Sequence, residues 1–368
     1  MTIAFLIAGL VSVTYHVIAI IAAIAHKWRR AVPSTTCPPV SILKPVYGLD
    51  DEFLAAIRSH AVQDYPAFEI VFGVHSLQDP AVGAVEQLIA EYPRVPIRIV
   101  EAGNGAANGK VHILTRLAAE AKYSVLLVND SDISVPPEYL RRITAPLVDP
   151  AVGLVTCLYR AESTSFAGKW EALGIATDFI PSTLVAPLVG IREFGLGSTL
   201  CFRRLDLDRI GGFSSIADYI ADDYQLSKRI TSLGLHTHLS DVVVSTHLSD
   251  PDWSSVWAHQ VRWARTIRVS RGDGYAGLPV THAGLWALLS AATGMVWLAL
   301  LLIAARILSG LFGGVGVLRQ KRLLYLFPLI PLWDLWAFAV WIAGWAGSVV
   351  VWRGKRYRLT HDGLLVPV

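Results

Sequence analysis

The first hydrophobic pattern in the chain is an apolar run at its N-terminal end. Residues 1–25 contain no Asp, Glu, Lys or Arg, and a basic cluster follows at residues 26–30. About 20 apolar helical residues are enough to cross the hydrocarbon core of a bilayer. A secretory signal carries its basic residues before the apolar run, whereas these residues follow it. The pattern therefore predicts a retained transmembrane anchor over residues 1–26.

Two more apolar regions lie near the other end, and they predict C-terminal membrane segments over residues 283–352. Residues 283–305 are long enough for one span. Residues 323–352 are longer than one span needs and contain Asp334 and two prolines, which predicts either a kinked span or a re-entrant pair.

Basic residues beside the apolar regions predict which parts of the chain face the cytoplasm. These basic residues are the cluster at 26–30, three arginines at 265, 268 and 271, and those within residues 353–368. They predict that the middle of the chain lies in the cytoplasm and that residues 353–368 form a cytoplasmic tail. Arg319, Lys321 and Arg322 conflict with this topology, because a span over residues 283–305 would put them on the opposite side. Either that loop lies at an interface or the predicted topology is wrong.

The composition is typical of a membrane protein and argues against a nucleic-acid-binding protein or a cysteine metal site. Apolar residues make up 53% of the chain and charged residues 17%, against about 45–50% and 25% in soluble domains. The net charge of +3 is mild and lies beside the apolar segments, which favours anionic headgroups over nucleic acid. The three cysteines are widely spaced, lack metal-ligand spacing and fit a reducing compartment.

Between residues 38 and 250 the pattern changes to short β-branched runs that alternate with amphipathic stretches. This alternation predicts an α/β domain with a mostly parallel sheet, followed at residues 251–282 by an amphipathic interfacial helix and a loop. The predicted strands cover residues 40–46, 68–74, 97–100, 124–130 and 152–158, and the predicted helices lie near residues 51–63, 80–91, 110–121 and 137–146.

Two acids follow the predicted strand at 124–130, where ligands bind in such sheets. Asp130 and Asp132 flank Ser131 in "LLVNDSDIS" and could turn two carboxylates toward one Mg²⁺ or Mn²⁺ that also binds a substrate diphosphate. An isolated D-x-D is equally typical of a solvated turn that caps the next helix.

A second acidic pair lies in "YIADDYQLSKRI", residues 219–230. Asp222 and Asp223 begin an amphipathic helix, where negative charge is favoured even without a function. A carboxylate near a bound sugar donor could instead act as a general base toward an acceptor hydroxyl.

The predicted helix at residues 253–271 has one apolar face and one polar face. His259, Arg262 and Thr266 lie opposite the apolar face, which we expect to rest in the membrane interface. Arg262 and Trp263 could then reach a phosphate-bearing ligand. The alternative is a basic amphipathic helix that only binds anionic lipid.

"GNGAANGKV" at residues 103–111 is not a phosphate-binding loop of an NTPase. Its first glycine is misplaced and Val111 stands where Ser or Thr is needed. A G-x-G-x-x-G motif after the first strand is also missing, so the sequence does not support a dinucleotide oxidoreductase.

Taken together, these motifs resemble those of membrane-bound inverting glycosyltransferases of the ceramide glucosyltransferase type, and the resemblance extends over residues 40–270. "RWARTIR" and "DFIPSTLVA" bring the chain closest to the bacterial branch that transfers N-acetylglucosamine to hopanoids. The motifs that carry the resemblance are "SILKPVYGLD", "QDYPAFEIVFGV", "NDSDIS", "GLVTCLYR", "FGLGSTLCFRR", "ADDY" and "HQVRWARTIR". The resemblance implies a glycosyltransferase A-type fold that binds a nucleotide sugar, with N- and C-terminal transmembrane helices.

The resemblance also implies roles for individual residues. The metal-binding aspartate falls on Asp130, with Asp132 completing the motif, and the catalytic base falls on Asp223. Lys110 matches a lysine near the diphosphate, and Pro45 lies beside the nucleotide pocket.

The family's terminal motif falls on His259, Arg262 and Trp263, although its first position is normally Gln or Arg. The family's base-reading aspartate is replaced here. Ser76 stands at its position and Asp79 lies three residues further on, so either residue could take over that contact.

The implied reaction is the transfer of one hexose, N-acetylglucosamine or glucose, from a UDP-sugar to the hydroxyl of a membrane lipid, with a hopanoid such as bacteriohopanetetrol as the favoured acceptor. The expected cofactor is Mg²⁺ or Mn²⁺, and the expected partners are the sugar donor, the lipid acceptor and the bilayer, without nucleic acid. The expected location is the bacterial inner membrane, with the catalytic domain in the cytoplasm.

Three alternatives to this function stay open. The first is a ceramide glucosyltransferase. The second is a processive polysaccharide synthase, which shares these motifs but needs a channel that three spans are few to form. The third is an inactive membrane sensor of sugar nucleotides, which would fit the missing first aspartate.

Overall fold

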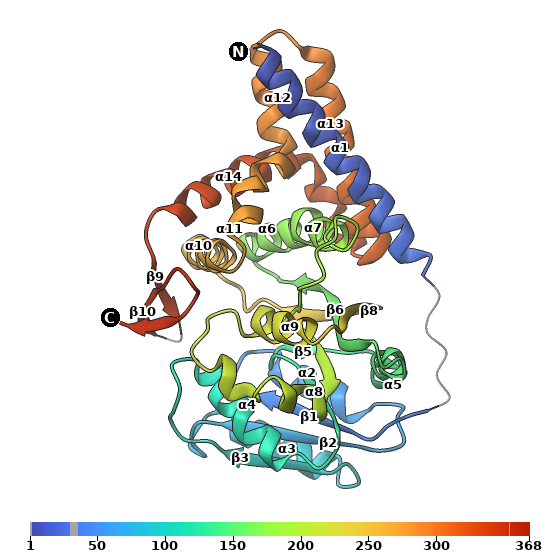
Figure 1. The fold of residues 1–368 in the computed structure, drawn as a ribbon, viewed down its shortest axis with the longest axis vertical. Helices are drawn as coiled ribbons and strands as arrows, with labels where there is room; N and C mark the ends of the chain where they lie inside the picture. The colour runs from blue at the N-terminus through green and yellow to red at the C-terminus, as the bar shows by residue number, and fades with distance from the viewer. Residues whose placement is uncertain (1, 30–35, 353) are drawn as a thin grey trace.

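The computed structural model describes residues 2–29, 36–352 and 354–368. Figure 1 shows apolar helices at one end of the molecule, an α/β domain at the other, and a layer of helices between them. Arg30 of the predicted basic cluster and residue 353 of the predicted tail lie outside the described residues.

The α/β domain is built on an eight-stranded sheet with the order β3-β2-β1-β4-β7-β6-β8-β5. Neighbours pair in parallel except at β4–β7, β6–β7 and β5–β8, so the predicted mostly parallel sheet is confirmed. The strands are β1 (Val40–Pro45), β2 (Phe68–Val74), β3 (Ile97–Glu101), β4 (Val125–Val128), β5 (Ile133–Ser134), β6 (Val152–Glu162), β7 (Leu200–Arg203) and β8 (His236–His247).

Helices cover both faces of this sheet. Ile42 of β1 packs with the core on one face, and the next residue, Leu43, packs with the core on the other. A strand buried on both faces is apolar at nearly every position, which explains the unbroken apolar runs in the sequence. The first face is covered by α2 (Phe53–Ala61), α3 (Ala81–Glu91) and α5 (Tyr139–Thr144), and the second by α4 (Gly109–Glu120), α8 (Arg204–Arg209) and α9 (Asp222–Ser232).

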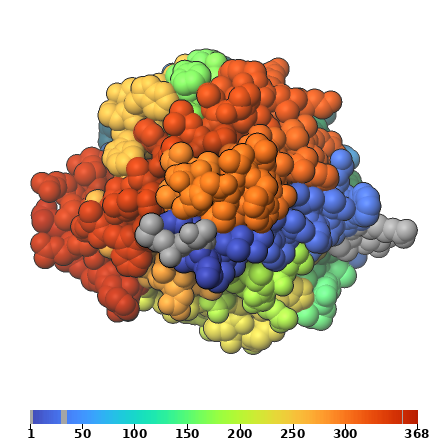
Figure 2. All heavy atoms as spheres, turned by 90° about the horizontal axis from the view of Figure 1, so that it is seen from above, coloured from blue at the N-terminus to red at the C-terminus, as the bar shows by residue number. Residues whose placement is uncertain are grey.

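Three helical stretches among the described residues are long and apolar enough to cross a membrane: Ile3–Lys27, Val296–Val317 and Lys321–Trp345. The first lies within α1 (Thr2–Lys27). The second joins α13 (Val296–Gly310) to η5 (Leu311–Val317), and the third joins η6 (Lys321–Leu329) to α14 (Ile330–Trp345). Viewed from above, α1 in blue lies beside the orange helices α12 and α13 (Figure 2).

The predicted single span over residues 283–305 is wrong. The chain reverses between α12 (Ala283–Ala292) and α13, where Gly294 has a φ of 83°. Glycine adopts this left-handed conformation without the steric cost that a side chain brings. The two helices therefore form a hairpin beside α1 (Figure 1).

This hairpin also removes the conflict in the predicted topology. The chain returns toward the catalytic domain, and the side chain of Gln320 donates a hydrogen bond of 2.5 Å to the carbonyl of Ala161 in β6. Arg319, Lys321 and Arg322 therefore lie on the same side as the catalytic domain.

The intermediate layer contains α6 (Phe166–Gly174), η2 (Ile175–Phe179), α7 (Ile180–Val185), α10 (Trp253–Ser270), α11 (Gly272–Gly277) and η4 (Leu278–Thr281). Helix α10 forms where the amphipathic helix was predicted, but part of its apolar face packs on protein instead of resting in lipid. Trp257 contacts Trp336 of α14 edge to face, with 5.1 Å between ring centroids. Figure 1 shows α14 running across the direction of α1.

The C-terminal residues form a second, small sheet. Strands β9 (Val349–Trp352), β10 (Lys355–Leu359) and β11 (Leu365–Pro367) pair in antiparallel order. The amide of Leu365 donates to the carbonyl of Asp218 at 2.8 Å, which joins this sheet to the loop before α9. The end of the predicted tail is thus part of the folded protein.

Candidate active site

A cavity of about 540 Å³ lies at the carboxyl ends of β1 and β4 and beneath α10. It brings together residues that lie more than 200 positions apart in the chain. The predicted site residues that line it are Pro45, Lys110, Asp130, Asp132, Asp223, His259, Arg262 and Trp263.

The aspartate pair follows directly from the end of β4. Asn129 is buried there, and its amide donates to the Tyr139 hydroxyl at 2.8 Å and to the Ser198 carbonyl at 2.6 Å. This anchor holds the first residues beyond the strand, so Asp130 and Asp132 both face the cavity. The carboxylate of Asp132 accepts a hydrogen bond from the Thr246 hydroxyl. Burial and the nearby Asp130 carboxylate raise the pKa of Asp132.

Lys110 lies in the first turn of α4, which Asn108 caps by accepting from the Val111 amide at 3.2 Å. Its ammonium nitrogen lies 2.7 Å from Asp130 and 3.0 Å from Asp222. Burial opposes the charge, but the two carboxylates outweigh it and raise the pKa of Lys110. The side chain therefore keeps a positive charge inside the cavity.

Asp223 occupies the first turn of α9. Its carboxylate accepts from the Gly197 amide at 3.1 Å and from the Tyr224 amide at 2.7 Å. Burial, together with the Asp222 carboxylate, raises the pKa of Asp223 to about 6. A carboxylate with such a pKa is a stronger base than an exposed aspartate and is still ionised near pH 7.

Gly197 lies between the two functional carboxylates. A Cβ atom at this position would lie 2.9 Å from an Asp130 oxygen and 3.6 Å from an Asp223 oxygen. A contact of 2.9 Å is closer than side-chain carbons tolerate, so any larger residue here would displace the Asp130 carboxylate. Asp130 and Asp223 therefore border the same small volume.

Helix α10 contributes the positive charge on the other side of the cavity. His259 Nδ1 lies 2.6 Å from the buried carboxylate of Glu171, and its ring contacts Trp263 edge to face. Arg262 forms no ion pair of 4 Å or less with any residue that the structure describes. Burial lowers its pKa, partly offset by Glu171. A half-buried guanidinium without such a partner is suited to bind an anionic ligand.

The metal prediction rests on two side chains. Among the described residues, no group of three or more His, Cys, Asp or Glu is arranged to hold a metal ion. Asp130 and Asp132 supply hard oxygen donors at one cavity, and Mg²⁺ is often held by one or two carboxylates plus substrate phosphates and water. The donor set thus fits a divalent ion that binds together with a diphosphate.

A second cavity of about 460 Å³ adjoins the first and extends toward the membrane helices. The residues that line both cavities are Ile175, Phe179, Gly195, Leu196, Tyr224, Trp263, Ile267 and Arg271. Most of the remaining lining is apolar, including Ala186 directly after α7, Leu278 of η4, and Ala337 and Val340 of α14. Ser182, Thr183 and Ile191 also line this cavity.

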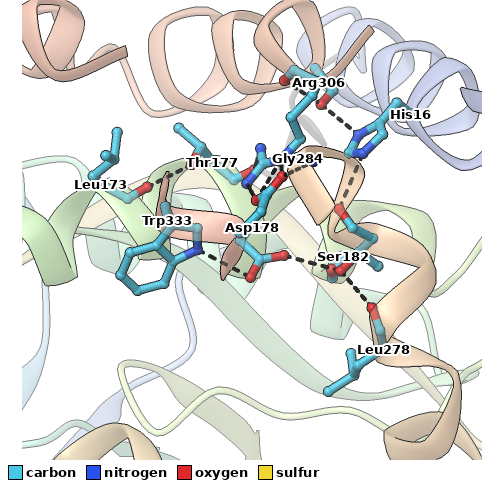
Figure 3. Close-up of polar contacts among 12 residues, drawn as sticks. His16, Leu173, Thr177, Asp178, Ser182, Leu278, Gly284, Arg306 and Trp333 are labelled. Carbon is cyan, nitrogen blue, oxygen red and sulfur yellow. Dashed lines mark hydrogen bonds and ion pairs between the residues drawn. The ribbon is translucent and has the colours of Figure 1, made fainter. Parts of the chain in front are cut away.

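Asp178 places a carboxylate in this second cavity. It accepts from the Thr281 hydroxyl and from the Trp333 indole, both at 3.4 Å (Figure 3). These bonds are long, so the carboxylate has capacity to accept a further hydrogen bond from a ligand hydroxyl or amide.

A buried ion pair joins the membrane helices above this cavity to the catalytic domain. Arg306 of α13 makes contacts of 2.8–3.1 Å with Asp334 of α14 and donates to the Thr177 carbonyl of η2 at 2.6 Å. Asp334 also accepts from the Gly284 amide at 2.8 Å, so four segments meet at this pair (Figure 3). Asp334, the acidic residue in the apolar region 323–352, therefore has a structural role.

The structure does not bring Ser76 and Asp79 into the cavity. Asp79 accepts from the Gly48 amide at 3.1 Å and from the Ala81 amide at 2.9 Å, so it joins two loops near the start of α3. The Ser76 hydroxyl bonds to the Gln78 side chain. A role of either residue in reading the nucleotide base stays a prediction.

Sequence reasoning did not predict the contacts of three residues at the site. Glu171 is the partner of His259, and Asp222 is the second partner of Lys110. Lys44 contacts the backbone of Asp130. Lys44 is fully buried in β1 and donates to the Asp130 carbonyl at 3.1 Å, and burial lowers its pKa to about 7. A single charge inside an apolar run, as at Lys44, was the available signal.

The geometry agrees with the comparisons to known proteins. The family model described as Glycosyl transferase family 21 matches residues 4–365. The chain belongs to glycosyl transferase family 21. A family 21 chain is a glycosyltransferase, which confirms the predicted enzyme class.

Two curated relatives act on lipids by name. The family 21 chain is 28% identical over 235 residues to ceramide glucosyltransferase 1 of Caenorhabditis elegans, covering 62% of this chain and 50% of that protein. It is 26% identical over 208 residues to the beta-monoglucosyldiacylglycerol synthase of Synechocystis sp., covering 55% of this chain and 42% of that protein. The matched regions thus span about half the length of these relatives or less. Together with the three apolar helices, they support a membrane protein.

The fold is also that of a solved glycosyltransferase. A mannosyltransferase from Pyrobaculum calidifontis, in complex with GDP-Man and Mn²⁺, superimposes with a TM-score of 0.57 at 20% identity, covering 92% of this chain and 98% of that one. The family 21 chain therefore has the predicted glycosyltransferase A-type fold, with apolar terminal helices that fit membrane spans.

Proposed function

We propose that the protein transfers one hexose, glucose or N-acetylglucosamine, from a UDP-sugar to a hydroxyl of a membrane lipid with inversion at the anomeric carbon. The observation that carries this proposal is the pair of adjoining cavities. One is charged and contains Asp130, Lys110 and Asp223, and the other is mostly apolar and extends toward the membrane helices. A polar donor and a lipid acceptor could thus meet where the cavities share their lining.

The donor diphosphate is proposed to lie between Lys110 and Arg262. Arg262 has no ion-pair partner among the described residues, so it can bind the diphosphate without breaking an internal pair. Asp130 and Asp132 would hold Mg²⁺ or Mn²⁺, which supplies positive charge to the leaving diphosphate when it is bound. Lys110 and Arg262 would stabilise the same developing charge.

Asp223 is proposed to be the general base. Its carboxylate takes the proton from the acceptor hydroxyl while that oxygen forms a bond to the anomeric carbon. The bond from this carbon to the diphosphate oxygen breaks on the opposite face, and UDP leaves with the electron pair. One displacement of this kind inverts the configuration.

The acceptor is proposed to place its apolar body in the second cavity and a further polar group on Asp178. We propose a hopanoid such as bacteriohopanetetrol, whose several hydroxyls would allow one to react while another binds Asp178. A ceramide is the second candidate, because the worm relative is named a ceramide glucosyltransferase. Its amide N–H could make the same contact.

The proposed location is the bacterial inner membrane, with the catalytic domain in the cytoplasm. The basic residues Lys27, Arg319, Lys321 and Arg322 all lie at the end of the membrane helices that adjoins the catalytic domain. Lysines and arginines are enriched on the cytoplasmic side of membranes.

The test is a transfer assay with the full-length protein in mixed micelles. Radiolabelled UDP-glucose, UDP-N-acetylglucosamine and GDP-mannose are each paired with bacteriohopanetetrol and with ceramide, and the extracted lipids are separated. A lipid that carries one sugar from a UDP-hexose is the expected product. Transfer only from GDP-mannose would contradict the donor, and long chains would identify a processive synthase. Donor binding without transfer to any lipid would identify a sensor.

A further inference from the structure

A third cavity, of about 290 Å³, lies where α1 and η5 end above α5 and β8. It is separate from the two cavities described above. Its lining comes from the ends of two membrane helices and from the catalytic domain, and it includes His26, Lys27, Arg142, Arg160, Asp241 and Arg319.

The lining has an excess of positive charge. Arg142 is paired with Asp241 at 2.5 Å and approaches Glu138 at 3.6 Å. Lys27 and Arg319 are exposed and form no ion pair with any residue that the structure describes. These two cations are therefore available to an anionic ligand.

Arg160 adds a third positive group that is only partly used. Its Nε atom donates to the Ser245 hydroxyl at 2.9 Å and lies 3.4 Å from Glu162. Neither terminal nitrogen of its guanidinium has a bond among the described residues. A planar guanidinium with free donors matches the oxygens of a phosphate group.

Two further features at this cavity cost free energy in the absence of a ligand. His26 is only 5% exposed, yet neither ring nitrogen has a hydrogen-bond partner among the described residues. Arg319 has a φ of 58°, in the left-handed region that non-glycine residues rarely adopt. Unsatisfied polar groups and strained backbone of this kind cluster at ligand sites.

The cavity continues an apolar, exposed surface of α1. Ile3, Ile7, Val17 and Ile21 are exposed on this helix, as expected of residues that face acyl chains. Lys27 follows at the end of the same helix, and basic residues at the ends of membrane helices are typical of the headgroup region. The position of the cavity thus favours a lipid over a soluble ligand.

We propose that this cavity binds the phosphate of an anionic phospholipid, with its acyl chains along α1. Lys27, Arg160 and Arg319 would contact the phosphate oxygens. Because the lining joins α1 and η5 to α5 and β8, the bound lipid would hold the catalytic domain against the membrane helices. This inference does not depend on the sugar or the acceptor of the proposed reaction.

The test measures lipid binding to the full-length protein in detergent by native mass spectrometry, with titrations of phosphatidylglycerol and phosphatidylcholine. One tightly bound phosphatidylglycerol and weaker phosphatidylcholine are expected. The double variant Lys27→Gln/Arg319→Gln is expected to bind phosphatidylglycerol about 30-fold more weakly, the effect of two basic residues beside an anionic lipid. Both side chains are exposed, so these substitutions leave the core intact.

The matched control is Lys321→Gln/Arg322→Gln, which removes the same charge from exposed residues that do not line the cavity. It is expected to bind phosphatidylglycerol like the unchanged protein. Equal loss in both double variants would show general attraction to anionic lipid and would overturn the site. Displacement of the lipid by glycerol 3-phosphate at similar concentrations would identify a soluble phosphate as the ligand instead.

Discussion

The substitution Asp223→Asn tests the proposed base most directly. Asparagine keeps the size of the side chain, so it removes the proton acceptor while the surrounding chain can stay in place. One of the two amide contacts, from Gly197 or Tyr224, would face the new NH₂ group and be lost, at a cost of about 1 kcal/mol. The substitution also removes a charge that burial disfavours, which offsets this loss.

The expected effect on catalysis is much larger than the effect on folding. General-base catalysis contributes about 10²- to 10⁴-fold, so kcat is expected to fall about 10³-fold, equivalent to about 4 kcal/mol of transition-state stabilisation. Donor affinity is expected to change little, because the proposed diphosphate contacts come from Lys110 and Arg262. The assay measures single-sugar transfer at saturating donor, with donor affinity from isothermal titration calorimetry.

The pH dependence gives an independent readout of the same residue. The base acts only when it is deprotonated, and its pKa is raised to about 6. The rate is therefore expected to fall about tenfold for each pH unit below 6, at a higher pH than an ordinary aspartate would produce. In Asp223→Asn the residual rate should lose this dependence.

The control is Asp208→Asn, which changes an exposed aspartate of α8 in the same way. It is expected to keep full activity and the same pH profile. A kcat for Asp223→Asn above a tenth of the original, or an unchanged acidic limb in its residual activity, would refute the role of Asp223 as base.

The other predictions concern the metal, the α10 contact and the membrane helices. Asp130→Ala is expected to weaken UDP-sugar binding in the presence of Mn²⁺ by about 2 kcal/mol, measured by calorimetry. A chelator is expected to abolish transfer by the unchanged protein. Full activity in the presence of the chelator would exclude a role of the metal. Glu171→Gln is expected to lower kcat/KM about tenfold, because His259 loses a charge-assisted hydrogen bond, and an unchanged value would show that this contact does not position α10. Arg306→Met leaves Asp334 buried without its partner, so it is expected to lower the free energy of unfolding in detergent by about 3–5 kcal/mol. Adding Asp334→Leu to this variant is expected to restore most of the lost stability. Equal stability of the single variant Arg306→Met and the double variant Arg306→Met/Asp334→Leu would contradict the proposed cost of an unpaired Asp334.

Much of the catalytic domain could be predicted because its signals are local. The strand before Asp130 is apolar at every position, which is the expected pattern for a strand covered on both faces. Two acids at the end of such a strand lie where α/β sheets bind ligands, so the aspartate pair was accessible from the sequence. Asp223 was assigned as the base from the motif "ADDY", which carries part of the family resemblance, and this role stays a prediction.

The errors arose where a local signal was weak or averaged out. Hydropathy treats residues 283–305 as one apolar stretch, although the reversal at Gly294 depends on a single residue in a left-handed conformation. The apolar face of α10 was expected to rest in lipid, because the sequence does not show that Trp336 would cover it. Ser76 and Asp79 were chosen by resemblance to a motif; the structure gives Asp79 two backbone contacts outside the cavity, and the base-reading role of either residue stays a prediction.

The apolar helices, the alternating elements of the catalytic domain and the acidic residues able to do the chemistry could all be inferred from the amino-acid sequence. Each of these follows from periodicity or from the residue types at neighbouring positions. Three features required the packed structure: Lys110 lies between Asp130 and Asp222, Glu171 contacts His259, and a mostly apolar cavity adjoins the charged one. These contacts join residues far apart in the chain, and their distances depend on how whole helices and strands pack.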